Sequence, residues 1–299
     1  MFSDMQITAA VEEYLIERGI NNDRKYDHFH ASEWDGCHRK VAYLYLEEKG
    51  RIERVPIQAN MIDPRIQRVF GNGHHVHFRW RKYLQDIGIL RGLWKCPICS
   101  FQTGKPFILG GSSKYGIIKP EQCDCGNRYL QYEELGFFDE ETNWGGHVDG
   151  ILDLRLADPR FVAEAVKPDT PDEDALMLCD FKSMKERKFK YLKRPEPKHY
   201  TQLQIYLYLS GLRCGKLIYE SKDEQAIKEF IIYPDQEMMA VKKEEAIKLK
   251  YIVEHQNSRG EWVVPVRPFE SPDEKGNWEC VNCKFAKKCW SGTEFRSEG

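Results

Sequence analysis

Patterns typical of strands and of helices alternate along the second half of this sequence, and this alternation restricts the possible folds more than any other feature. The strand patterns are short apolar or alternating runs, whereas the helix patterns repeat apolar residues every three or four positions. Strands are expected at 147–154, 176–182, 216–220 and 226–233, and helices at 197–212 and 235–256. Interleaved strands and helices favour an α/β fold, with a mixed sheet flanked by helices, over a helical bundle or a β-sandwich.

The first half of the sequence is mainly helical and contains one segment of a different character. Helices are expected within 1–50, with a break at 28–36, and at about 65–86. Residues 94–127 are rich in Gly, Ser, Lys and Cys and show little periodicity, which is typical of an inserted module. We therefore divide the chain into an N-terminal helical part (1–93), an insertion (94–128), a core (129–264) and a cysteine-bearing tail (265–299).

The N-terminus carries no pattern of a targeting or membrane segment. Residues 1–19 have the charge pattern of an amphipathic helix rather than of a signal peptide. No run approaches the roughly 18 apolar residues that a membrane span needs. We expect a soluble protein that acts in the cytoplasm, which is the host cytoplasm if the protein is encoded by a phage.

The formal net charge is −2, so any binding to a polyanion has to come from a local cluster of basic residues. Residues 182–198 contain eight Lys or Arg and two acids, with Phe189 and Tyr191 among them. Most basic runs are simply solvated surface, but this one directly follows a candidate catalytic lysine. It predicts a surface for phosphate binding and base stacking. The DNA-binding candidates are Lys185, Arg187, Lys188, Lys190, Lys193 and Arg194.

Two carboxylates and a lysine form the central candidate site. Asp180 and Lys182 are two apart on an expected strand, so their side chains share one face. Asp149 lies on the preceding strand, next to Gly150. Carboxylates that meet at strand ends make an oxygen-rich site suited to Mg²⁺ or Mn²⁺, and a lysine beside them can orient an attacking water. Taken alone, Asp-x-Lys is more often three ordinary surface residues.

Two further patterns support this site. Gln202 and Tyr206 are four apart on the next expected helix, so they share a face of that helix. His77 ends the run Gly73-His74-His75-Val76-His77 in the earlier helix, and an imidazole there can complete a metal shell. A polar helix stripe and a structural histidine are the ordinary alternatives.

In this order the motifs resemble those of the PD-(D/E)XK nuclease superfamily, specifically its RecB-like exonuclease branch. That family has Gly-x-x-x-His on a helix, Gly-x-x-Asp and (Asp/Glu)-x-Lys on successive strands, and Gln-x-x-x-Tyr on a helix. The matching residues are Gly73 to His77, Gly146 to Asp149, Asp180 to Lys182 and Gln202 to Tyr206. Gly71 with His75 also fits the first motif, but Gly-x-x-Val-His is closer to the family pattern. Asp180 stands where many members have Glu.

The resemblance implies a restriction-endonuclease-like central mixed sheet flanked by helices and a role for each matched residue. His77, Asp149 and Asp180 would bind Mg²⁺ or Mn²⁺ together with the backbone carbonyl of Phe181. Lys182 would position the attacking water. Gln202 and Tyr206 would steady the site and contact DNA.

Three cysteines in the tail form an incomplete tetrahedral set. Cys280, Cys283 and Cys289 lack a fourth partner, for which Cys37 is the obvious candidate. One cysteine before the core and three after it is similar to AddB and to the CRISPR adaptation nucleases, where the set holds a 4Fe-4S cluster. The resemblance therefore implies an iron–sulfur cluster on these four residues. Zinc, which also accepts four thiolates, is the alternative.

A second cysteine group lies in the insertion. Cys96 and Cys99 have the spacing of a zinc knuckle, and Cys123 and Cys125 form a tighter Cys-x-Cys. This arrangement resembles a zinc ribbon, a module that can grip DNA or a partner protein or only stiffen the insertion. Cys179 and Cys214 lie in apolar segments and are expected in the core.

These residues together predict a deoxyribonuclease that depends on Mg²⁺ or Mn²⁺ and hydrolyses DNA phosphodiesters. We expect an exonuclease on single strands or duplex ends, similar to phage-encoded members that act in recombination, replication or repair. Two alternatives stay open: a CRISPR-type adaptation factor that trims ends for an integrase, and a DNA-binding module that has lost cutting.

Overall fold

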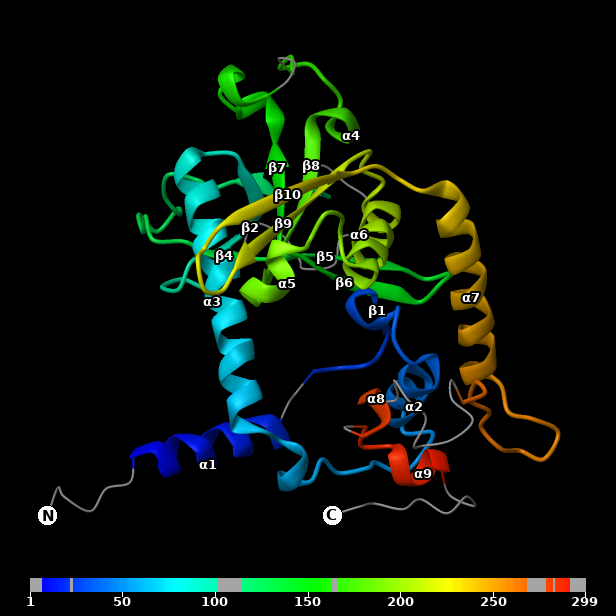
Figure 1. The fold of residues 1–299 in the computed structure, drawn as a ribbon. Coiled ribbons are helices and arrows are strands. Elements are labelled where there is room, and N and C mark those ends of the chain that lie inside the picture. The colour runs from blue at the N-terminus through cyan, green and yellow to red at the C-terminus, as the bar shows by residue number, and fades with distance from the viewer. Residues whose placement is uncertain are drawn as a thin grey trace, which may run out of the picture. The chain divides into compact units, whose positions relative to one another are not determined.

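The computed structural model describes residues 7–21, 24–101, 114–162, 166–267, 278–281 and 283–290. Its helices, labelled in Figure 1, are α1 (Ile7–Ile20), α2 (His38–Glu48), α3 (Pro64–Ile87), α4 (Asp172–Ala175), α5 (Glu186–Lys190), α6 (Pro197–Ser210), α7 (Gln236–Glu254), α8 (Trp278–Val281) and α9 (Ala286–Trp290). Its strands are β1 (Phe29–His30), β2 (Leu90–Lys95), β3 (Ile117–Ile118), β4 (Gln131–Glu133), β5 (Leu135–Asp139), β6 (Trp144–Val148), β7 (Gly150–Asp153), β8 (Leu176–Met184), β9 (Gly215–Ser221) and β10 (Ile227–Ile232).

The chain divides into two compact units, each made of segments that are distant in sequence. The first unit contains Met1–Phe29, Gly36–Asn72 and Lys248–Gly299, and the second contains His30–Asp35 and Gly73–Ile247. The four-segment division expected from the sequence stays a prediction.

The second unit is built on a mixed sheet, which confirms the predicted α/β class. The strands follow the order β10-β9-β8-β7-β2-β3, and β4 also pairs with β2. Strands β8 and β9 are parallel, and the other pairs of this sheet are antiparallel. Since parallel neighbours need a long crossover, α5 and α6 lie between β8 and β9 in the chain, and α6 packs against both strands.

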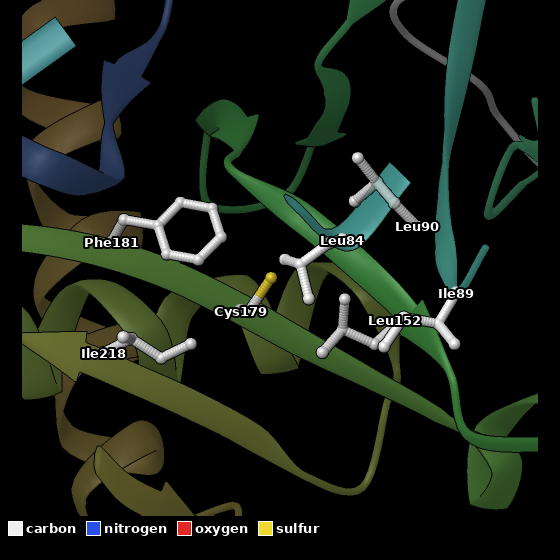
Figure 2. Packing of buried hydrophobic residues seen from close by; sticks show 7 residues of the cluster. All are labelled: Leu84, Ile89, Leu90, Leu152, Cys179, Phe181 and Ile218. Carbon is white, nitrogen blue, oxygen red and sulfur yellow. The ribbon is translucent and has the colours of Figure 1, made fainter. Parts of the chain in front are cut away.

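Alternate residues of the strands point to opposite faces of this sheet, and helices cover the apolar side chains on those faces. On one face, side chains of β7, β8 and β9 pack with the end of α3 in a hydrophobic core, shown in Figure 2. That core consists of Leu84, Ile89, Leu90, Leu152, Cys179, Phe181 and Ile218. Cys179 is fully buried there, and Cys214 is half-buried.

The alternating run at 147–154 is not one strand, contrary to the sequence prediction. It divides at Asp149 into β6, which pairs with β5 in a three-stranded sheet, and β7, which pairs with β8 in the main sheet. Gly150 permits the change of sheet, because a Cβ there would lie 2.9 Å from Cys179 Sγ and from Leu90 Cδ1. Asp149, at the division, is therefore held in place by the pairing of β6 before it and of β7 after it.

Strand β2 and helix α5 are among the elements of the second unit that were not predicted. Strand β2 pairs with β3, β4 and β7 and continues through Lys95, so sheet structure extends into the segment interpreted as an insertion. The basic segment after Lys182, expected as a loop, contains the short helix α5.

The first unit contains α1 and α2, and the short helices α8 and α9 near the C-terminus. Its core joins Tyr43 and Leu44 of α2 to Phe285, and the rings of Tyr43 and Phe285 stack with centroids 5.1 Å apart. Residues 1–6 of the predicted N-terminal helix lie outside the described residues. In the described part of the chain, no helix is both long enough and apolar enough to span a membrane.

Candidate functional site

Strand β8 positions the first two residues of the site. Asp180 and Lys182 point to the sheet face that carries α6, and Lys182 Nζ lies 2.7 Å from Asp180 Oδ2. Asp180 is 3% exposed. Phe181, between them, points to the opposite face, where its ring stacks on Trp80 of α3 with centroids 5.7 Å apart. Figure 2 shows Phe181 beside Cys179 in that core, so packing on one face fixes the two polar side chains on the other.

Asp149 connects three elements. It occupies the junction of β6 and β7 and is 6% exposed. Its Oδ1 lies 2.9 Å from Nδ1 of His77 on α3. Its Oδ2 accepts a hydrogen bond of 2.7 Å from the backbone N–H of Phe181. One carboxylate therefore ties the helix α3 to strand β8.

Helix α6 supplies the last two predicted residues. Lys182 Nζ donates to Oε1 of Gln202 at 2.9 Å, and Nε2 of Gln202 donates to the hydroxyl of Tyr206 at 3.3 Å. Gly146 of β6 allows Tyr206 to approach, because a Cβ at this glycine would lie 2.9 Å from the tyrosine ring. The structure therefore brings the Gly-x-x-Asp, Asp-x-Lys and Gln-x-x-x-Tyr residues together.

Of the two histidines that fit the first motif, the structure places His77 against Asp149. His75 is exposed on α3. The two residues are about 200° apart around a helix of 3.6 residues per turn, so one helix face cannot direct both toward the same carboxylate.

The two carboxylates have pKa values displaced in opposite directions. Burial raises the pKa of Asp149, but the hydrogen bond and charge of His77, together with Lys182, lower it to about 2. Burial raises the pKa of Asp180 to about 6, because the nearby charge of Asp149 adds to it and Lys182 only partly offsets both. Negative charge at Asp180 is thus incompletely compensated by the protein's own cations.

The residues present have the donor chemistry for a divalent metal ion, although the donor atoms of His77, Asp149 and Asp180 do not all lie within 4.8 Å of one another. Asp180 Oδ2 is buried and, among the described residues, accepts no hydrogen bond of good geometry, although the ammonium of Lys182 is close. Carboxylate oxygens are the donors that Mg²⁺ and Mn²⁺ prefer, and an imidazole is compatible with Mn²⁺. Asp149, Asp180 and His77 supply these groups, and Phe181 supplies a backbone carbonyl on the same strand.

Three residues beside this network were not assigned to the site from the sequence. The hydroxyl of Tyr132 donates to the backbone carbonyl of Asp149 at 3.3 Å. Arg81 lies 5.5 Å from the centre of the Tyr132 ring and pairs with Glu134 at 2.8 Å. Arg81 could have been suspected because it lies one helical turn after His77. Tyr132, on β4, and Glu134, directly after β4, have no spacing relative to the site motifs that would have marked them in the sequence.

The cysteines of the insertion form a compact four-sulfur group. Sγ of Cys96 lies 3.6 Å from that of Cys125, and Sγ of Cys99 lies 3.4 Å from that of Cys123. All four atoms are within 4.8 Å of one another. Hydrogen bonds from the backbone of Cys99 and the side chain of Asn127 lower the pKa of Cys96 to about 6, which favours its thiolate. The pKa values of Cys123 and Cys125 are raised instead, because hydrogen bonds from backbone N–H groups, which lower them, are outweighed by burial and by hydrogen bonds with the neighbouring cysteines. This group can bind a metal ion. Residues 102–113, between the two cysteine pairs, lie outside the described residues.

The other predicted cysteine set lines one cavity in the first unit. Cys37 stands at the start of α2, and Cys280, Cys283 and Cys289 come from the tail. The cavity is also lined by Arg39, Lys40, Tyr43, Phe285, Ala286 and Trp290. Burial raises the pKa of Cys37, Cys280 and Cys283. The two cationic side chains complement an anionic group bound by thiolates.

The basic segment after β8 is mostly surface. Lys185, Arg187, Lys188, Lys190, Lys193 and Arg194 are all exposed, as is Tyr191. Lys190 pairs with Glu186, and Lys188 lies 3.5 Å from Glu196. Phe189 is buried, with Lys228 4.8 Å from the centre of its ring. The prediction that Phe189 stacks on bases is therefore wrong, because its ring anchors α5 instead.

No protein-family model matches this chain, and no curated protein sequence matches it. The solved structure of SSO0001 is similar over 95% of this chain and 96% of that chain, with 16% identity and a TM-score of 0.42. The alkaline exonuclease LHK-Exo from Laribacter hongkongensis is similar over 81% of this chain and 92% of its own, with 13% identity and a TM-score of 0.36. Its complex with dAMP gives 14% identity, the same coverage and a TM-score of 0.34. At this level of similarity, function has to be inferred from the side chains of the site itself.

Proposed function

We propose that this protein is a metal-dependent DNA nuclease of the RecB-like type. It acts as an exonuclease on single strands or duplex ends, in the cytoplasm, during recombination, replication or repair in a phage or its host. One observation carries the proposal: Asp149, at the junction of β6 and β7, lies together with Asp180 and Lys182 of β8, and His77 on α3 and Gln202 on α6 complete their contacts.

Each residue of the network has a role in phosphodiester hydrolysis. Mg²⁺ or Mn²⁺, held by Asp149, Asp180 and His77, would lower the pKa of the attacking water and stabilise charge on the phosphate. Lys182 lies where its ammonium can orient that water, since Nζ already contacts Asp180 and Gln202. Gln202 in turn is held by Tyr206. This chain of contacts fixes the lysine before DNA arrives.

The exposed basic segment supplies the DNA-binding surface in this proposal. It begins three residues after Lys182 in sequence and carries Lys185, Arg187, Lys193 and Arg194 in solvent. Cations there bind the phosphate backbone without regard to base sequence, which suits an exonuclease.

The test is cleavage of end-labelled single- and double-stranded DNA with and without Mn²⁺. Asp180→Asn should lower the cleavage rate by roughly 10³-fold while leaving DNA affinity intact. Asp169→Asn, at an exposed position, is the matched control and should cut normally.

Absence of Mn²⁺-dependent cutting by intact wild-type protein would contradict the proposal. If that protein still bound DNA, it would be a binding module that has lost cutting. Copurification of an integrase would instead favour the CRISPR-type adaptation factor.

We further propose that Cys37, Cys280, Cys283 and Cys289 hold a 4Fe-4S cluster rather than zinc. Within the described residues, the Cys96 group is the one set of possible ligands whose donor atoms all lie within 4.8 Å of one another. A single zinc ion needs its thiolates about 4 Å apart. In a cluster each thiolate binds its own iron, so the sulfurs stand farther apart around a larger cavity. The cavity beside Arg39 and Lys40 supports the cluster.

For the insertion we propose a zinc-ribbon-like module. The Sγ–Sγ distances of 3.4 Å and 3.6 Å between its cysteines suit thiolates that share one tetrahedral Zn²⁺. Its role is to stiffen the insertion or to bind DNA or a partner protein.

A further inference from the structure

Helix α6 presents three polar side chains on the face that packs against the sheet. His199, Gln202 and Tyr206 follow at spacings of three and four, which places them on one face of the helix. Gln202 and Tyr206 belong to the network around Lys182. His199 extends the same row by one turn, and the proposed function leaves it without a role.

Tyr219 connects His199 to the strand that carries the site. Lys182 and Tyr219 are direct partners in the parallel pairing of β8 with β9, so both side chains point to the α6 face. Tyr219 is fully buried, and its hydroxyl accepts a hydrogen bond of 3.1 Å from the backbone N–H of Glu196. The same hydroxyl lies 3.0 Å from Nδ1 of His199.

These contacts define which nitrogen of His199 carries the proton. The hydroxyl of Tyr219 already accepts from Glu196, and its own hydrogen needs an acceptor because it is buried. Nδ1 of His199 is that acceptor, so the ring carries its hydrogen on Nε2. The described residues provide no hydrogen-bond partner for Nε2, and the side chain is 16% exposed. A directed N–H donor is therefore available at the surface.

The surroundings of His199 favour an anion. Burial lowers its pKa to about 3, helped by the charges of Lys182, Lys198 and Lys188. The imidazole therefore stays neutral at physiological pH. Lys182, Lys188 and Lys198 create a positive potential at the ring, which Glu196 offsets in part from the Nδ1 side, where its Oε2 lies 3.9 Å from that nitrogen. A neutral donor in such a potential is suited to a phosphate oxygen.

We propose that Nε2–H of His199 donates a hydrogen bond to a phosphate group of the bound DNA strand. This phosphate is the neighbour, on the same strand, of the phosphate that is cut. This inference rests on the proposed nuclease function and adds a substrate-binding residue to it. The ligand is either an internal phosphodiester or a terminal phosphomonoester of the strand. Tyr219 is the positioning residue that fixes the ring.

Two conservative variants separate this role from a structural one. In His199→Gln the side-chain amide can reach the position of Nε2 and donate from it. In His199→Asn the side-chain oxygen can replace Nδ1 and accept from Tyr219, but nothing replaces Nε2. Binding is measured by fluorescence anisotropy of labelled single strands with Ca²⁺ in place of Mn²⁺, and a gel checks that the DNA stays whole.

We expect His199→Asn to bind about tenfold more weakly than wild type, and His199→Gln to stay within about threefold of it. The salt dependence gives a second readout. His199→Asn should leave the slope of log affinity against log salt unchanged, because the imidazole is neutral. Lys188→Ala, the charged comparison, should reduce that slope by about 0.7.

The opposite ranking would overturn the inference: an unaffected His199→Asn with a weakened His199→Gln means that the ring serves only Tyr219. A slope lowered by His199→Asn would also overturn it. DNA with a 5′-phosphate or a 5′-hydroxyl distinguishes the two ligand sources, since an equal defect indicates the phosphodiester and a defect on phosphorylated ends alone indicates the terminal group. Because binding is measured without cutting, failure here is distinct from failure of the cleavage assay.

Discussion

At the scale of single residues, one glycine decides whether the site can form. A Cβ at Gly146 would lie 2.9 Å from Cε1 and 3.0 Å from the hydroxyl of Tyr206, whose side chain is buried and cannot move aside. Gly146→Ala should therefore displace Tyr206 and release Gln202 and Lys182, with a loss of about 1–3 kcal/mol in unfolding free energy. The cleavage rate and the urea midpoint should both fall.

The matched control is Gly71→Ala in α3. A Cβ at Gly71 meets nothing within 4 Å, and alanine favours a helix over glycine by up to about 1 kcal/mol. The control should keep its activity and gain slightly in stability. A wild-type rate in Gly146→Ala would mean that the contact with Tyr206 does not order the site.

A second prediction at this scale concerns acid stability. Asp153 is buried, which alone would raise its pKa, but hydrogen bonds from Arg155 and Arg91 lower it. A carboxylate with a lowered pKa in the folded state stabilises the fold above its unfolded pKa of about 3.9. That contribution disappears as the pH falls through the folded value.

Asp153→Asn should cost about 2–3 kcal/mol at neutral pH. The difference from wild type, measured as urea-unfolding free energy at a series of pH values, should shrink below about pH 4. A difference that stayed constant down to pH 2 would show that Asp153 acts through packing rather than charge.

At the scale of elements, the sequence predicted the strands and helices that repeat clearly and missed those fixed by partners far along the chain. The spacing of Gln202 and Tyr206 was enough to put both on one face of α6. Strand β2 was missed because it is largely buried and shows no alternation. The division of one run at Asp149 depends on β5 and β8, which no local pattern reveals. Phe189 was misassigned because Lys228, on β10, covers it.

The zinc-ribbon-like module proposed for the insertion gives a prediction at this scale, because its first cysteine directly follows β2. Cys96 is next to Lys95, and Nε1 of Trp94 donates to the carbonyl of Ile117 at 2.9 Å. Removal of the ion, or Cys99→Ser, should therefore loosen the end of β2 as well as the cysteine turns. Amide exchange should accelerate at β2 and β4 but not at β9.

Elemental analysis should find one zinc per insertion in wild type and none in Cys99→Ser. Cys214→Ser, outside both proposed sets, is the control and should keep its zinc. Unchanged amide exchange in β2 after zinc loss would separate the module from the sheet.

At the scale of the whole molecule, the first unit is assembled from both ends of the chain. Cys37 and the tail cysteines are more than 200 residues apart in sequence yet line one cavity. A cluster that bonds both ends would act as a cross-link, worth on the order of 4–5 kcal/mol in the chain-entropy model. The sequence indicated that Cys37 joins the tail cysteines, through the incomplete set of three and its resemblance to the split sets of AddB and the CRISPR adaptation nucleases. The accompanying core of Tyr43 and Phe285 had no pattern that marked it.

Anaerobically purified wild type should be brown, with broad visible absorption and about four irons per chain. Cys283→Ser should bleach the protein and lower its melting temperature, whereas Cys214→Ser should change neither. A colourless wild type that contains a second zinc would contradict the iron–sulfur cluster and would show that these four cysteines bind zinc.

The contacts of Asp149 matter for the design of an inactive variant that still binds DNA. The side chain of Asp149 accepts the backbone N–H of Phe181 on β8, and its carbonyl accepts the hydroxyl of Tyr132 on β4, so this residue holds two strands of the main sheet besides contacting His77. Removing its carboxylate would leave the buried backbone N–H of Phe181 without an acceptor. A loss of activity in such a variant could then come from misfolding as well as from the missing catalytic group. The side chain of Lys182 makes no hydrogen bond to the backbone in the described residues. Substitution of Lys182 is therefore the better way to inactivate the protein while preserving its fold.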